Sequence, residues 1–100
     1  MLEKSIEKKL REVIEAAGGM CLKFESPGFT GVPDRIILLP GRHVLFAETK
    51  KPGDKERVRQ KYVQSILRKL GFTVYNTVDS IEKIKQIEHD CVRLMQNENI

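Results

Sequence analysis

The chain has 100 residues, enough for one small domain with its own hydrophobic core and too few for a second. Lysine and arginine total 18 against 14 aspartates and glutamates, so the net charge is +4, which excludes an acidic disordered chain and permits a polyanionic partner. No apolar run is long enough to span a membrane, and the N-terminus lacks the pattern of a secretory signal, so we expect a cytoplasmic, non-secreted protein without a membrane partner.

Hydropathy periodicity predicts seven elements in the order helix, three strands, helix, strand, helix. The first helix spans residues 3–17, and the strands span residues 20–24, 35–39, 44–48 and 73–77. The second helix spans residues 54–70, and the third begins after Asp79 or Ser80. This order predicts one α/β domain, residues 1–95, with a four-stranded mixed sheet, followed by a polar C-terminal tail over residues 96–100 that frays.

The second helix carries two specific expectations. Asp54 is expected to cap its N-terminus, since an aspartate side chain can accept a hydrogen bond from the first free backbone N–H groups. Its apolar stripe is expected to face the core, and comprises Val58, Tyr62, Ile66, Leu67 and Leu70.

The second and third predicted strands flank a Pro-Gly-Arg turn and so predict a β-hairpin. Its register decides which side chains meet. Pairing of Leu38 with Val44 places Asp34 opposite Glu48, whereas pairing of Leu39 with Val44 turns Asp34 to the other face. We expect the first register, which requires a bulged turn.

In that register, charged side chains gather at the open end of the hairpin. Glu48 and Lys50 are two residues apart on a strand and share a face with Asp34. Two carboxylates about 5 Å apart repel each other unless a cation lies between them, and hard divalent ions, Mg²⁺ or Mn²⁺, prefer oxygen ligands. A metal, a water and a lysine together are the groups suited to hydrolysis of a phosphodiester. The alternative is a small interaction domain whose strand-end charges are simply solvated.

Two segments then carry a family resemblance: Gly-Val-Pro-Asp-Arg at residues 31–35 and Phe-Ala-Glu-Thr-Lys at residues 46–50. They resemble the two halves of the PD-(D/E)xK nuclease motif and, more closely, the Gly-x-Pro-Asp turn and Glu-x-Lys strand of the VRR-NUC family. Lys-Phe at 23–24, Ser-Pro-Gly at 26–28 and Leu-Gly-Phe at 70–72 also look like that family. The resemblance implies a restriction-endonuclease-like fold, a three-layer αβββαβα core, and a metal-dependent nuclease.

The resemblance also implies roles for individual residues. Asp34 and Glu48 would bind the metal, the backbone carbonyl of Thr49 would be a further ligand, and Lys50 would orient the water.

A glutamate of the first helix often joins the metal shell in this family. Glu7 is the first choice and Glu3 the alternative. Both flank the apolar face of the helix, Glu3 nearer its middle, so the helical wheel does not decide between them. Gln60 matches a family glutamine beside the catalytic site.

Beside such a site, a basic run favours contact with phosphates over a merely solvated face. The residues expected to contact nucleic acid are Lys51, Lys55, Arg57, Arg59, Lys61, Arg35 and Ser26, with pairing to an acid as the alternative for Arg35. Small stand-alone members of the family come from phages and bacteria and act as homodimers on branched DNA. This implies a homodimer that cuts branched DNA such as four-way (Holliday) junctions, without a small-molecule cofactor. A catalytically silent nucleic-acid-binding module of the same fold is the alternative function.

Overall fold

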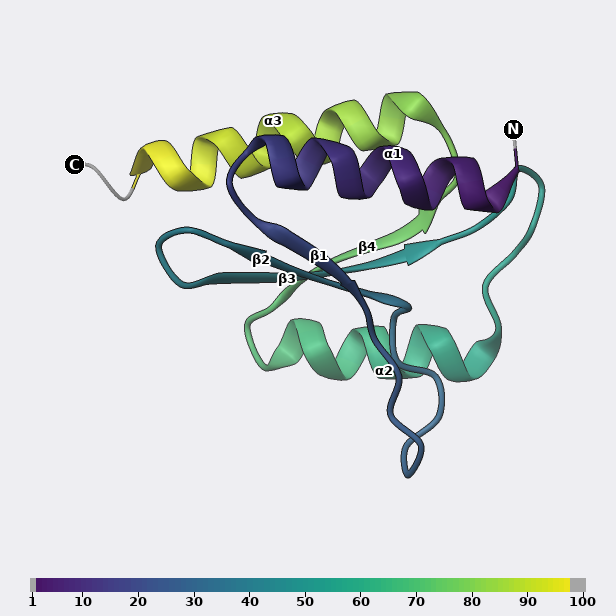
Figure 1. Cartoon of the computed structure of the whole chain (residues 1–100). Coiled ribbons are helices and arrows are strands. Elements are labelled where there is room, and N and C mark those ends of the chain that lie inside the picture. The colour runs from purple at the N-terminus through teal and green to yellow at the C-terminus, as the bar shows by residue number, and fades with distance from the viewer. Residues whose placement is uncertain (1, 98–100) are drawn as a thin grey trace.

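The computed structural model describes residues 2–97 and places the seven elements in the expected order (Figure 1). They are α1 (Glu3–Ala16), β1 (Met20–Lys23), β2 (Arg35–Leu39), β3 (His43–Thr49), α2 (Val58–Lys69), β4 (Thr73–Val78) and α3 (Ile81–Asn97). The expected tail is therefore helical through Asn97, and residues 98–100 lie outside the described residues. None of the helices within the described range is long and apolar enough to cross a membrane.

The four strands form one mixed sheet, as predicted, and their order in it is β1-β2-β3-β4. β1, β2 and β3 are antiparallel neighbours, and β4 runs parallel to β3 because α2 carries the chain back across the sheet. Figure 1 shows α1 and α3 together on one face of the sheet and α2 on the other, which gives the expected three layers.

The main core lies between the sheet and the pair α1 and α3. Alternate residues of β2 and β3 point into it, including Ile37, Leu45 and Ala47, because successive strand residues face opposite sides. Their helical partners in the core are Ile6, Leu10, Val13, Ile14, Ile84, Ile87 and Cys91. On the α2 face, the Phe46 ring packs against Phe24 and Phe72 at centroid distances of 5.7 and 5.5 Å.

The predicted start of the second helix was wrong, because α2 begins at Val58 and Asp54 caps nothing. Gly53 lies in a turn with φ +90°, and the Asp54 N–H donates to the Lys51 carbonyl, so the chain runs extended before the helix. The helix begins instead where the Gln60 side chain accepts a hydrogen bond from the Arg57 N–H at 2.9 Å.

The predicted apolar stripe of this helix was wrong in part, since only Ile66 and Leu67 of its five residues are half-buried. Val58, Tyr62 and Leu70 are 84%, 54% and 68% exposed, whereas Val63 and Gln64 are buried. Burial of Gln64 is tolerated because its amide donates to the Glu56 carboxylate at 2.6 Å. The packing face is therefore rotated from the one that hydropathy alone indicates.

The hairpin register is the one predicted. Leu38 pairs with Val44 and Leu39 with His43, around a three-residue turn in which Gly41 and Arg42 have φ of 87° and 68°. Extrapolated by one residue beyond Arg35 and Ala47, this register sets Asp34 opposite Glu48.

Candidate active site

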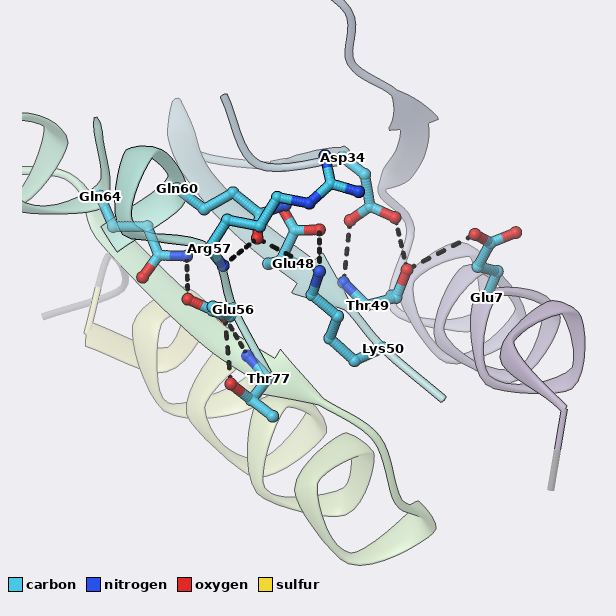
Figure 2. Close-up of polar contacts among 10 residues, drawn as sticks. All are labelled: Glu7, Asp34, Glu48, Thr49, Lys50, Glu56, Arg57, Gln60, Gln64 and Thr77. Carbon is cyan, nitrogen blue, oxygen red and sulfur yellow. Dashed lines mark hydrogen bonds and ion pairs between the residues drawn. The ribbon is translucent and has the colours of Figure 1, made fainter. Parts of the chain in front are cut away.

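The side chains of the predicted site meet at the open end of the β2–β3 hairpin (Figure 2). Asp34 immediately precedes β2, Glu48 and Thr49 end β3, and Lys50 follows. The strand end is irregular, because the register between β3 and β4 shifts between Ala47 and Thr49. This bulge increases the local twist just where the charged residues lie.

Thr49 holds the Asp34 carboxylate in place. Its backbone N–H donates to Asp34 Oδ1 at 2.8 Å, and its hydroxyl donates to Asp34 Oδ2. Burial raises the pKa of Asp34 above its usual value, and the two Thr49 hydrogen bonds oppose the rise. The aspartate is therefore oriented before any ligand arrives.

Glu48 is a buried carboxylate, 5% exposed. Its Oε2 lies 4.0 Å from Lys50 Nζ, and its Oε1 has no hydrogen-bond partner among the residues described. Burial, followed by the charge of Asp34, raises the pKa of Glu48 to about 7, while Lys50 opposes the rise. The Lys50 ammonium compensates this buried carboxylate only in part, since Oε1 has no partner among the described residues.

Lys50 is held by the start of α2. Its ammonium donates to Gln60 Oε1 at 3.2 Å, and the same oxygen accepts the Arg57 N–H. In Figure 2 the Arg57 side chain extends from the first turn of α2 across the site. The predicted lysine and glutamine are thus in direct contact, although they are ten residues apart.

Both candidate glutamates of α1 lie at the site. Glu3, Glu7 and Asp34 each offer a carboxylate oxygen within 4.8 Å of the others, and Glu48 lies outside this group of three. Glu7 pairs with Arg35 Nη2 at 3.0 Å, and its Oε1 lies 3.5 Å from the Thr49 hydroxyl oxygen, so Glu7 and Asp34 share that single hydroxyl proton. Arg35 therefore follows the second of its two predicted alternatives, the pairing with an acid.

The donor set fits a hard divalent cation. Every acidic group at the hairpin end offers carboxylate oxygen, and one buried oxygen, Glu48 Oε1, lacks a partner in the described chain. Burial, followed by the charges of Glu7 and Asp34, raises the pKa of Glu3, while Lys50 opposes the rise.

Five of the predicted DNA-contacting residues are exposed on or before α2: Lys51, Lys55, Arg57, Arg59 and Lys61. They lie on the chain between Lys50 and the middle of α2, so the positive surface borders the site. Ser26 is half-buried and lines a shallow pocket of about 440 Å³ in the β1–β2 loop.

Glu56 is a structural partner of the site that the sequence did not indicate. Its carboxylate accepts from the Thr77 N–H at 2.6 Å, the Thr77 hydroxyl at 3.1 Å and the Gln64 amide. Thr77 has φ 47° and lies beside the β3–β4 bulge. Figure 2 shows this cluster next to Gln60 and Lys50, where it fixes the segment leading into α2.

Comparison with known proteins identifies similar chains. No protein-family model matches. The chain is 43% identical over 72 residues to "Putative nuclease p44" of Acyrthosiphon pisum secondary endosymbiont phage 1, which covers 72% of this chain and 77% of the relative. A solved structure described as a VRR-NUC domain superposes with a TM-score of 0.79 at 30% identity, covering 87% of this chain and 95% of the other.

Proposed function

Because the chain belongs to the VRR-NUC family of nucleases, we propose that it is an endonuclease that hydrolyses phosphodiester bonds of DNA with Mg²⁺ or Mn²⁺ as cofactor. The observation that carries the proposal is the state of Glu48, which is buried beside another carboxylate and has one oxygen without a partner in the described chain. Such a residue destabilises the fold unless it serves a bound cation.

The ligands proposed for the metal are Asp34, Glu48, the backbone carbonyl of Thr49 and Glu7, with Glu3 beside them. When bound, the cation supplies Lewis-acid stabilisation of a phosphate and makes a water more acidic. Thr49 keeps the Asp34 carboxylate oriented for this task.

Lys50 is proposed to hold the attacking water or to stabilise the charge that grows on the phosphate. Its amine is already oriented by Gln60, which we propose acts through this contact. Orientation before the reaction reduces the reorganisation that the transition state would otherwise require.

The DNA is proposed to lie along the exposed basic residues of α2 and the segment before it, which include Arg57 at the site (Figure 2) and Lys51, the residue after Lys50. We further propose a homodimer that acts on branched DNA such as four-way junctions, since a two-fold dimer presents two sites for paired cuts. The phage origin of the relative supports a role in the cytoplasm of an infected cell.

The test is a cleavage assay on matched four-way junction, duplex and single-stranded DNA, with Mg²⁺, Mn²⁺ or EDTA. We expect junction cleavage with either metal and none in EDTA. Binding without cleavage under all metal conditions would replace the proposal with the silent nucleic-acid-binding module. Sedimentation analysis of the junction complex tests the dimer, which requires two protein chains per junction.

A further inference from the structure

Two half-exposed aromatic rings lie outside the core, one in the β1–β2 loop and one on α2. Phe29, in the β1–β2 loop, is 43% exposed, and Tyr62, on α2, is 54% exposed. The Arg59 guanidinium carbon lies 4.6 Å from the Phe29 ring centroid and 5.3 Å from that of Tyr62. We call these three residues the aromatic platform.

The platform is fixed to the fold from both sides. Arg59 Nε donates to the Thr30 carbonyl at 3.0 Å, which ties the β1–β2 loop to α2. Gly31 has φ +93°, and a Cβ there would lie 2.7 Å from Arg59 Cγ and 3.0 Å from the Arg59 carbonyl oxygen. The backbone of the β1–β2 loop therefore packs directly against the Arg59 side chain of α2, which keeps the rings in place before a ligand binds.

In the sequence, the residues of the platform are near those of the site. Arg59 directly precedes Gln60, whose side chain holds Lys50, so their Cα atoms are about 3.8 Å apart. Thr30 lies four residues before Asp34. Two exposed lysines are also near in sequence: Lys61 lies in α2, and Lys55 lies in the segment before it. Figure 1 shows the β1–β2 loop extending past α2.

Planar rings beside a guanidinium, on a helix that also carries exposed basic residues, are the chemistry that binds a nucleobase on its face and its phosphates alongside. A base inside a duplex has both faces covered by its neighbours, so a platform of this kind acts only on an unstacked base. We propose that the aromatic platform stacks an unpaired nucleobase of the bound DNA. This rests on the proposed nuclease function, and it makes unpaired bases at a branch point the feature of the substrate that is recognised.

The test uses 2-aminopurine, whose fluorescence is quenched by stacking, at the unpaired position of a splayed duplex. The wild-type protein in EDTA is expected to quench it. The double variant Phe29→Leu/Tyr62→Leu keeps the apolar bulk and removes both ring faces. We expect it to lose the quenching and to bind the splayed DNA at least about fivefold more weakly. This fold-change is the lower end of the range expected for the loss of one base–aromatic stack. Its affinity for the fully paired duplex should be unchanged.

Leu70→Ala is the matched control, because Leu70 is 68% exposed at the far end of the same helix. It should quench and bind as the wild type does. If the leucine double variant, folded by circular dichroism, retains wild-type quenching and the same splayed-to-duplex affinity ratio, the platform proposal is overturned. Cleavage by the wild type is scored separately. Loss of quenching in the variant with no cleavage by the wild type would keep the platform and remove the nuclease proposal.

Discussion

Replacing Glu48 with glutamine is expected to stabilise the metal-free protein at pH 8. The rise of the Glu48 pKa from 4.5 to about 7 makes its charged form about 3 kcal/mol less favourable in the folded protein. An acid whose folded pKa is raised stabilises the fold below its unfolded pKa, and this contribution is lost as the pH rises through the folded value. The penalty is therefore complete at pH 8 and absent near pH 4.

Glutamine removes the charge but leaves an amide in a position where Glu48 Oε1 finds no partner in the described chain, which costs about 1 kcal/mol. The expected net gain is about 1–2 kcal/mol, and a domain of this size shifts its Tm by about 4–8 °C per kcal/mol. Thermal denaturation in EDTA measures it. We expect a rise of at least about 4 °C at pH 8 and no advantage at pH 4.

Adding Mg²⁺ to the same experiment tests the site. The wild type should gain stability with metal concentration, because only the folded state binds it, and Glu48→Gln should gain much less. Glu88→Gln, at an exposed position of α3, is the control for loss of one charge and should respond like the wild type. A Glu48→Gln variant that is less stable at pH 8, or equally responsive to Mg²⁺, would refute the reasoning.

Three further predictions concern the surroundings of Glu48. Lys50→Ala should abolish cleavage while DNA binding remains measurable by fluorescence anisotropy, and wild-type cutting by that variant would remove the lysine from the mechanism. Glu56→Ala should lower the free energy of unfolding by about 1–3 kcal/mol in urea, because three donors lose their acceptor; an equal loss in exposed Glu88→Ala would contradict this. Gly31→Ala should cost more than about 2 kcal/mol and Gly53→Ala about 1 kcal/mol, since both have positive φ but only Gly31 is crowded by α2. Equal losses in urea unfolding would show that the crowding is relieved without cost.

The hairpin and its charged end could be predicted from the sequence because side chains alternate strictly between the two faces of a strand. A slip of one residue would have moved Asp34 away from Glu48 and turned Phe46 out of its aromatic contacts. The register that pairs the apolar residues of β2 and β3 therefore also predicts which polar residues lie opposite each other at the end of the hairpin. The family resemblance set Gln60 beside the site, but its contact with Lys50 was not predicted, since nothing in the strand pattern places a helix over Lys50.

The start and packing face of α2 were not accessible, because long-range bonds decide both. Asp54 is a good local N-cap, but Glu56 is bound to Thr77, 21 residues away, which keeps the preceding segment extended. Gln64 reads as a solvent-facing residue, and its burial depends on that same Glu56. Hydropathy periodicity predicts neither the late start of α2 nor the burial of Gln64, since it contains no information about a polar partner in another element.

One carbonyl oxygen of Gln60 both starts a helix and holds an amine. Fraying at the first turn of α2 would therefore loosen the ammonium of Lys50, and a force that pulls on that ammonium would strain the first turn. The effects of changes at position 60 on helix integrity and on turnover are consequently inseparable by substitution alone. Amide hydrogen exchange at Arg57, read alongside the rate, would report the two quantities independently.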